Sequence, residues 1–345
     1  MKKVSLFVLL LIFFLTMPVM VFAQKNDSLP TILKTLKFDG VIKTKLETSA
    51  HDGDMRFYVR NARFGARGDI GEFFSYRMQV DFVGSDGQFQ ALDFFATFKP
   101  TKNLSLLFGQ QNTPFDNSYM TSPGEFMFAN NAFVGDYLTP GSRDMGLVAQ
   151  YKFRISGFPM EGQAGMFNGG RINDAQWTDK PSYVFRMIAG SMTGFRSTAK
   201  VYRYNNENME RDWLLWGADL RYASSCLRVE TEIMNRHSYD DKSDLLGGYI
   251  QSDYMFYMRN YNAMFRTISP AARIDLMGYD VWNSGFDVTK CTAGLKFGLT
   301  FIPFDTLLRI DYEHYFMRKD FDFSMISNRP HIADHKFTVE VVVKF

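Results

Sequence analysis

Apolar and polar residues alternate at every second position along most of this chain. The pattern is clearest in residues 335–345, where five apolar side chains between Phe337 and the terminal Phe345 fall on one face. Polar side chains occupy the other face, with Val342 as the exception. A period of two over this length predicts a β-strand with one apolar and one wet side.

About sixteen segments of this kind follow one another, each near the roughly ten residues that a tilted membrane strand requires. Short turns containing Gly, Pro or Ser separate them in alternation with longer polar links, as periplasmic turns alternate with outer loops in membrane barrels. Fourteen or eighteen strands remain open, because the turn within residues 258–270 is poorly defined. The predicted strands are 36–48, 55–67, 73–83, 89–98, 104–110, 145–153, 160–168, 182–190, 197–204, 213–222, 227–235, 245–257, 271–279, 289–301, 307–316 and 336–345.

The amino terminus has the organisation of a secretory signal peptide. Lys2 and Lys3 precede an apolar run, and Ala23 ends it with a small residue, which predicts cleavage before Gln24. A retained helical anchor is the alternative, but Pro18 interrupts a run that would need about 20 apolar residues. We expect residues 1–23 to be removed, 24–34 to form a short tail and 35–345 to form an all-β transmembrane antiparallel barrel.

Composition agrees with a barrel and argues against other classes. Without the two leader lysines, 37 basic residues balance 37 acidic ones, so no net charge points to nucleic acid. Mean hydropathy is −0.19, too low for a helical membrane protein, whereas aromatic residues reach 16%. Aromatic girdles at both membrane interfaces account for such a content.

Odd and even positions of a strand point to opposite faces of the sheet, here one toward lipid and one toward the lumen; we call this the parity of a residue. The lumen face is too charged for a dry core, since buried charges cost several kcal/mol each, and sixteen strands are wide enough for an aqueous channel. Parity switches near Asn61, which indicates a bulge. The predicted pore wall comprises Arg56, Arg60, Arg77, Arg186, Arg221, Arg228, Arg273, Lys290, Lys296, Arg309, Asp81, Asp93 and Asp311.

One connection, residues 111–143, is long and lacks alternation. It is the third outer loop, and its many aromatic residues favour folding into the lumen, where it would narrow the pore; a capping or trimer-contact loop is the alternative. Residues 126–133 are expected to form a short helix. The predicted constriction residues are Asp116, Tyr119, Glu125, Asp136, Tyr137 and Arg143.

Two motifs beside this loop are similar to a known family. Residues 108–115 (FGQQNTPF), followed by 140–146 (PGSRDMG), resemble the phosphate-selective porin O and P family, with shorter echoes at 58–65, 92–96 and 165–169. The resemblance implies a sixteen-stranded barrel, commonly a homotrimer, with the third loop in the lumen. A chain ending on an aromatic strand residue also resembles Gram-negative outer-membrane barrels, whose last residue, here Phe345, is read by the barrel assembly machinery. Expected partners are therefore outer-membrane lipid, that machinery, and small solutes or anions.

Selectivity is less defined by the sequence. Phosphate-preferring members look like arginine ladders that lead to a basic constriction, because stripping water from an anion needs fixed cationic donors. Here the loop has Arg143 as its one cation beside three carboxylates. We therefore favour a porin for passive diffusion of small hydrophilic solutes, with anion preference open, over a phosphate- or polyphosphate-selective channel.

Enzyme and adhesin functions rank lower. Cys291 and His314 fall on neighbouring strands as a conceivable thiol–imidazole pair, but an incidental pair is the simpler interpretation. We predict no catalytic residues, metal or cofactor, and no disulfide, since Cys226 and Cys291 fall at opposite rims. The first two outer loops are too short for an elaborated adhesin.

Overall fold

The computed structural model describes residues 35–84, 87–258, 264–300, 305–319, 321 and 334–345. The predicted signal peptide and residues 24–34 of the tail lie outside this range. Among the described residues, no helix is long and apolar enough to cross a membrane.

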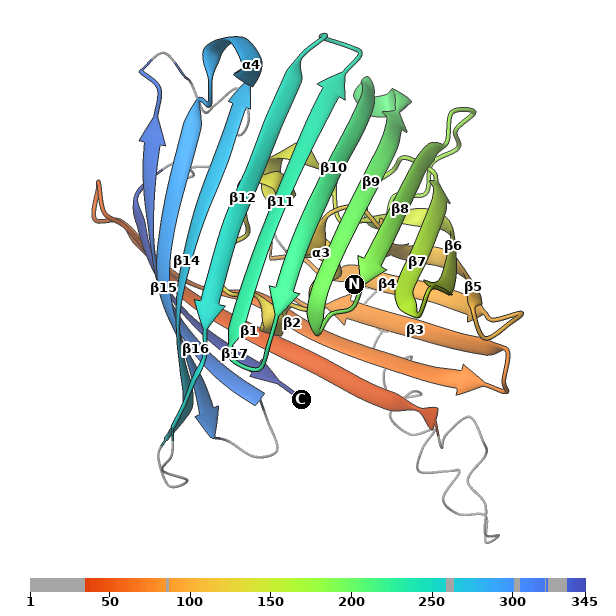
Figure 1. The fold of residues 1–345 in the computed structure, drawn as a ribbon, viewed down its shortest axis with the longest axis horizontal. Coiled ribbons are helices and arrows are strands. Elements are labelled where there is room, and N and C mark those ends of the chain that lie inside the picture. The colour runs from red at the N-terminus through yellow and green to blue at the C-terminus, as the bar shows by residue number, and fades with distance from the viewer. Residues whose placement is uncertain (1–34, 85–86, 259–263, 301–304, 320, 322–333) are drawn as a thin grey trace, which may run out of the picture.

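Within the described residues, seventeen strands form a single antiparallel sheet, and apart from the pairing of β12 with β14 each strand pairs with its neighbours in sequence. The sheet closes because β1 also pairs with β17, from Val41 opposite Lys344 to Ser49 opposite Lys336 (Figure 1). The two-residue β13 pairs with β14 beyond the end of β12 and adds no position to the ring, which therefore has sixteen strands. The predicted closed barrel of about sixteen strands is confirmed. The strands are β1 (Lys37–Ser49), β2 (Met55–Ile70), β3 (Phe74–Asp81), β4 (Gln90–Phe98), β5 (Leu104–Asn112), β6 (Arg143–Ile155), β7 (Phe158–Phe167), β8 (Ser182–Gly190), β9 (Gly194–Asn206), β10 (Arg211–Ala223), β11 (Leu227–Ser238), β12 (Asp244–Tyr254), β13 (Phe256–Tyr257), β14 (Phe265–Tyr279), β15 (Val288–Thr300), β16 (Asp305–Met317) and β17 (Lys336–Lys344).

The predicted change of parity in β2 is a β-bulge. Lys43 of β1 pairs with Asn61, but the next residue, Thr44, pairs with Val59, so Arg60 is an extra residue in β2. Because side chains alternate between faces, one extra residue restores the inward direction for Asn61 and Arg63.

Apolar side chains cover the outer surface of the barrel. Phe57, Phe108 and Ile250, for example, are 75%, 71% and 54% exposed. Their polar strand neighbours turn inward, as Gln251 does beside Ile250 in a hydrogen bond with Glu230. An exposed apolar band of this kind matches a surface that faces hydrocarbon.

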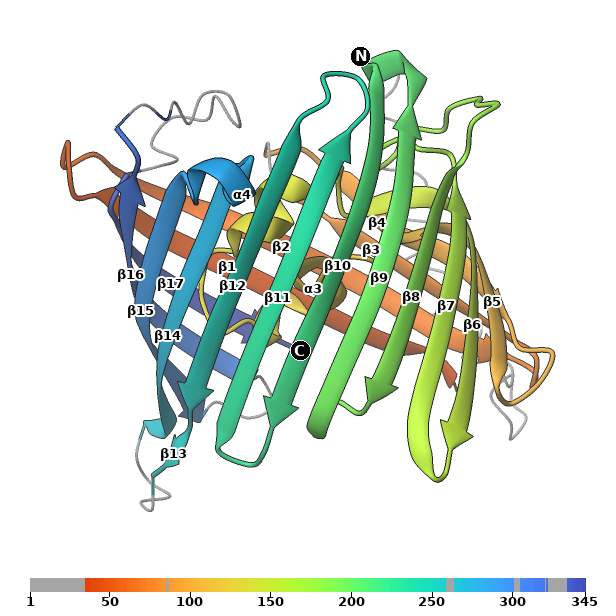
Figure 2. The same ribbon diagram turned by 45° about the horizontal axis from the view of Figure 1, so that its top comes forward.

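The apolar core lies inside the barrel rather than between two layers. Residues 113–142, which we call the lumen segment, connect β5 to β6 and carry three short helical turns: α3 (Asn117–Met120), η1 (Pro123–Glu125) and η2 (Val134–Leu138). In Figure 2 these turns lie within the ring of strands. The remaining helices, η3 (Glu207–Met209) and α4 (Val281–Ser284), belong to outer connections.

The helix expected over residues 126–133 is wrong. This stretch is irregular, and helical turns flank it on both sides. Its backbone groups form hydrogen bonds with charged side chains of the wall. They are therefore not available for the i to i−4 hydrogen bonds of a helix.

Candidate functional site

Side chains of β16 and β1 hold the lumen segment against one side of the barrel wall. Lys45 donates from Nζ to the carbonyl oxygen of Ala129 at 2.7 Å and to Asn130 Oδ1 at 2.7 Å. The backbone N–H of Ala129 donates to Asp311 Oδ2 at 2.6 Å, and Arg309 donates to the carbonyl oxygen of Gly124 at 3.1 Å. The wall charges thus replace the missing secondary structure as partners for the segment's backbone.

A second set of contacts comes from β14 and β15. Arg273 donates to the carbonyl oxygens of Asn130 and Asn131, each at 3.0 Å. Lys290 donates to the same Asn131 oxygen at 3.2 Å, and Asp275 accepts from the N–H of Phe133 at 3.0 Å. Two cations and one carboxylate therefore hold the irregular stretch from Asn130 to Phe133.

Strands β8 to β11 complete the attachment. Arg186 donates to Asn117 Oδ1 at 2.8 Å in α3, and Arg236 donates to the carbonyl oxygen of Tyr137 in η2 at 2.9 Å. Aromatic packing adds to these polar contacts, as the ring of Phe115 lies 5.7 Å from that of Tyr202. The lumen segment consequently covers the inner wall from β8 round to β1 and leaves β2 to β6 uncovered.

This cover changes the interpretation of the predicted pore wall. Seven of the predicted wall residues point inward but are only 9% exposed or less, because the lumen segment and neighbouring side chains cover them: Arg186, Arg273, Lys290, Arg309, Asp81, Asp93 and Asp311. The other six keep part of their surface accessible: Arg56, Arg60, Arg77, Arg221, Arg228 and Lys296.

The covered charges are paired. Glu340 on β17, with no exposed surface, lies 2.5 Å from Arg309, 3.0 Å from Lys43 and 3.8 Å from Lys45. Removing one partner from such a group leaves a buried charge uncompensated, which costs more than the pair itself contributes.

A similar network surrounds Asp275 and Glu313. Arg273 lies 2.8 Å from Asp275 and 3.8 Å from Glu313, and Lys290 lies 3.7 Å and 3.5 Å from the same two carboxylates. Both cations also hold the lumen segment, so the ion pairs fix the side chains that anchor it.

The predicted constriction residues separate into buried and accessible groups. Asp116 is 2% exposed, and Arg143, at 8%, donates to Asp93 Oδ1 at 2.7 Å. Glu125 is 57% exposed at its side chain, 4.0 Å from Lys344.

Asp136 is likewise exposed, and accepts from Asn131 at 3.0 Å. Tyr137 is half-buried, with its ring 5.8 Å from that of Phe133. The Tyr119 side chain lies outside what the structure describes.

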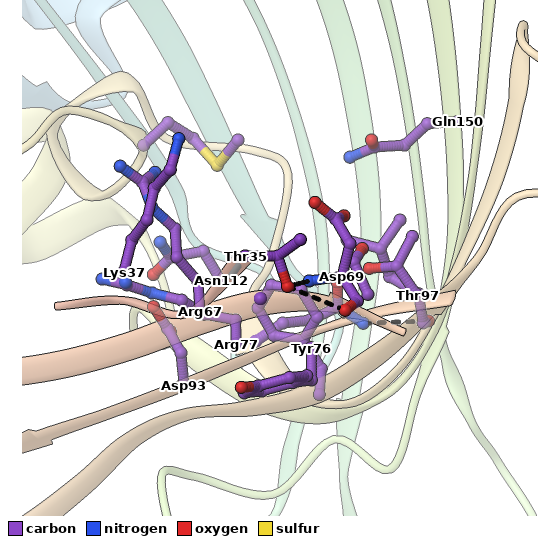
Figure 3. Close-up of a pocket in the computed structure, with 16 residues that line it drawn as sticks. Thr35, Lys37, Arg67, Asp69, Tyr76, Arg77, Asp93, Thr97, Asn112 and Gln150 are labelled. Atoms are coloured by element: carbon purple, nitrogen blue, oxygen red, sulfur yellow. Dashed lines mark hydrogen bonds between the residues drawn. The ribbon is translucent and has the colours of Figure 1, made fainter. Parts of the chain in front are cut away.

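An open cavity of about 620 Å³ lies on the uncovered side of the lumen. Strands β1 to β6 supply most of its lining, and Met120 of α3 supplies the edge of the lumen segment (Figure 3). Lys37, Arg67, Arg77, Asp69 and Asp93 give this lining both signs of charge. Of these, Arg77 and Asp93 are among the predicted pore-wall residues.

The cations of this lining are largely occupied by carboxylates. Arg77 forms a two-pronged ion pair with Asp39, with its Nη2 2.9 Å from Oδ1, and Arg67 lies 4.0 Å from the same group. Arg63, nearby on β2, lies 3.0 Å from Asp81. Guanidinium donors already used in this way are less available to a passing solute.

Sequence reasoning missed two sets of residues. Lys37 and Arg67 line the cavity, and Lys43 and Lys45 join the buried network with Glu340. The signal that identifies them was present, since each shares the inward parity of its strand. What parity does not reveal is which inward residues the lumen segment covers.

Cys291 and His314 lie directly opposite each other in the pairing of β15 with β16. The His314 ring stacks on that of His335, with centroids 4.0 Å apart. Both cysteines are free thiols. No group of three or more His, Cys, Asp or Glu side chains within the described ranges could hold a metal ion.

Comparison with known proteins agrees with the geometry. The sequence model of the family phosphate-selective porin O and P matches residues 40–214, just over half of the chain. No curated protein matches the sequence.

Among solved structures, Salmonella typhi OmpF in complex with daunomycin has a TM-score of 0.63 at 12% identity, covering 90% of this chain and 97% of the other. OmpT, an outer membrane protein of Vibrio cholerae, has a TM-score of 0.61 at 11% identity, covering 92% and 100%. An anion-selective porin from Comamonas acidovorans has a TM-score of 0.59 at 10% identity, covering 90% and 98%. At such identities the likeness concerns the fold.

Proposed function

The chain belongs to the phosphate-selective porin O and P family of outer-membrane channels, and we propose that it carries small hydrophilic solutes by passive diffusion with a preference for anions. No chemical step is involved. Pore width and the charges along the wall determine which solutes cross and how fast.

The observation that supports an anion preference is the separation of charges by burial. Thirteen carboxylates and eight basic side chains are buried among the described residues. The sequence alone shows equal numbers of the two signs, but acidic groups are the ones preferentially withdrawn from water. The accessible charge is therefore shifted toward the positive sign.

Several cations on the inner wall keep part of their side chain accessible. Arg196, Arg221, Arg228 and Lys296 are between 12% and 16% exposed at their side chains. Each of them also pairs with a wall carboxylate, so four cations face the three acids Asp219, Glu230 and Asp253. The remaining excess of positive charge raises the local concentration of anions.

A general anion preference fits the site better than selective phosphate binding. Stripping water from phosphate requires several donors without partners, whereas Arg63, Arg77 and Arg143 all engage carboxylates along the open side. Selective binding of phosphate or polyphosphate is the second candidate, and the family's description is what favours it.

An enzymatic role is not supported by the arrangement. Cys291 and His314 lie on the outward face of the strands, and His314 stacks on another imidazole rather than on a carboxylate that would orient it. A nucleophile needs a base held in place by a third group.

The assembly we propose is a homotrimer in the outer membrane of a Gram-negative bacterium, exported through the cleaved signal peptide. A Vibrio cholerae neighbour in fold is described as a trimer form. Light scattering of the detergent-purified protein should give three times the mass of the chain, and the mass of one chain would refute the trimer.

Recognition by the barrel assembly machinery through Phe345 is a further part of this proposal. The Phe345 ring is 49% exposed, and its backbone pairs with Gly40 of β1. The terminal aromatic residue thus stands at the seam where the sheet closes.

Planar-bilayer recording tests the selectivity directly. In a potassium chloride gradient, the reversal potential should show chloride permeating better than potassium, and added phosphate should block the chloride current only weakly. Strong block at low phosphate would favour the selective channel, and preference for potassium would refute both.

A pair of variants assigns the effect to the lumen. Arg221→Gln with Arg228→Gln should lower the anion preference, most clearly at low salt, because about 0.1 M salt screens charges beyond roughly 10 Å. Arg203→Gln is the matched control, since Arg203 lies on the outward parity of β9 beside Asp212, 2.7 Å away. An equal change in the control would contradict the assignment.

A further inference from the structure

The lumen segment carries a carboxyl group that is buried with one oxygen unpartnered. Asp116 caps α3, accepting from the N–H of Ser118 at 3.0 Å through Oδ1. Its Oδ2 is buried and has no hydrogen-bond partner. The enclosure is tight, because a Cβ added at Gly135 would lie 2.8 Å from that oxygen.

A second carboxyl group with the same property faces it from the wall. Glu232 on β11 is 1% exposed, and its Oε2 is also buried without a hydrogen-bond partner. Its Oε1 accepts from the N–H of Asn117 at 3.4 Å, which places it beside the start of α3. Two carboxyl groups that share a dry site cannot both carry a full charge without cost.

The cation at this site is already engaged. Lys200 forms an ion pair with Glu232 and lies 3.6 Å from Asp219. Its charge is therefore divided between two wall carboxylates before Asp116 is considered. The charged and titratable groups that face Asp116 are Arg186 on β8, Lys200 on β9, Glu232 on β11, Tyr249 on β12 and Asp136 on η2. Behind them, Asp219 on β10 faces Lys200, Arg186 and Arg196.

Burial, and then the charge of Glu232, raise the pKa of Asp116 to about 8, and Lys200 opposes this only in part. The protonated carboxyl group is therefore the form that suits the docked segment near neutral pH. A free segment, exposed to water, would have the ordinary value near 4.

We propose that Asp116 is a proton-dependent latch: with its proton, the α3 end of the lumen segment docks on β8 to β12, and without it this docking loosens. The docked state binds more protons than the undocked state, so a rise in pH favours undocking. The equilibrium constant for docking is largest in acid. It falls by at most about tenfold per pH unit above pH 4 and becomes constant above about pH 8. The latch would control opening of the pore, and it does not depend on which solute the channel carries.

Spin labelling at the end of α3 tests the latch. Met120 is 40% exposed and borders the open cavity, so a nitroxide on Met120→Cys, in a Cys226→Ser, Cys291→Ser background, reports on α3. In liposomes, the label should be immobilised at pH 5 and show a growing mobile component toward pH 9. Asp116→Asn, a neutral mimic of the protonated group, should hold the label immobile throughout.

Glu125→Gln is the matched control, because Glu125 is a carboxylate on the same segment with a side chain 57% exposed, and it does not contribute to the pKa of Asp116. It should keep the pH response. Equal mobility at pH 5 and 9 in the parent protein, or loss of the response in the control, would overturn the proposal.

Heat-modifiable migration on gels verifies that each barrel is folded. Should Asp116→Asn fail to fold, Glu232→Gln replaces it, since removing the neighbouring charge and releasing Lys200 both lower the pKa of Asp116. The rise in mobility must then shrink, and an unchanged rise would refute the latch. The spin-label readout does not depend on ion selectivity, so it fails or succeeds separately from the proposed function.

Discussion

The ammonium group of Lys45 on β1 lies 2.7 Å from the carbonyl oxygen of Ala129, which is 84 residues further along the chain. This contact joins the first strand of the barrel to the middle of the lumen segment. Both groups are buried, so each satisfies a polar atom that water does not reach.

We predict that Lys45→Met weakens the docking of the lumen segment while the barrel remains folded. The carbonyl oxygen of Ala129 and Oδ1 of Asn130 would lose their donor, at a cost of about 1–3 kcal/mol for unsatisfied buried acceptors. Single-channel recordings should show increased open-channel noise. Lys99→Met, which removes an exposed turn lysine 3.5 Å from Asp69, should leave the noise unchanged; equal noise in both variants would contradict the anchor.

Gly40→Ala should weaken the seam of the barrel. A Cβ at Gly40 would clash with the ring of Phe345, so the terminal ring must move. Because this ring is 49% exposed and can swing aside, the cost should fall at the lower end of the about 1–3 kcal/mol that overpacking of a core brings. Urea unfolding in detergent micelles measures the loss.

Gly162→Ala on β7 is the control for this substitution, because its added Cβ would meet nothing closer than 3.7 Å. The change there should stay within about 0.5 kcal/mol. Similar midpoints for the two variants would show that the ring of Phe345 is not held at Gly40.

Met78→Arg and Gln79→Arg test the two faces of β3 at adjacent positions. Met78 is exposed on the outer face, where arginine near the membrane midplane costs about 2–4 kcal/mol. Gln79 has inward parity, opposite Gly65, so arginine there should change stability far less. Unfolding from lipid vesicles is the measurement, and a greater loss for Gln79→Arg would invert the assignment of faces.

Much of the barrel follows from local patterns. A period-two pattern places Met78 outward and Gln79 inward whatever the rest of the chain does, because successive side chains must point to opposite faces. The change of parity near Asn61 was enough to predict the bulge that pairing with Lys43 and Thr44 confirms. The strand beginning Leu104 was harder to delimit, since its pairing with β6 continues to Asn112 and shortens the predicted loop.

The lumen segment shows where local reasoning fails. The run from Phe126 to Phe133 has the composition of a short apolar helix, yet Arg273, Asp275 and Lys290 hold its backbone as irregular chain. These partners lie about 140 to 160 residues away in sequence. No window along the chain contains both sides of such a contact.

By itself, the sequence determined the class of fold and the face on which each strand residue lies, and it indicated about sixteen strands, because alternation is a local property of the chain. Only the tertiary structure decided which inward charges remain in water. Arg309 and Arg221 have the same parity, but Arg309 lies under the lumen segment and Arg221 does not. Burial depends on what packs against a side chain, and here that is a segment from another part of the chain.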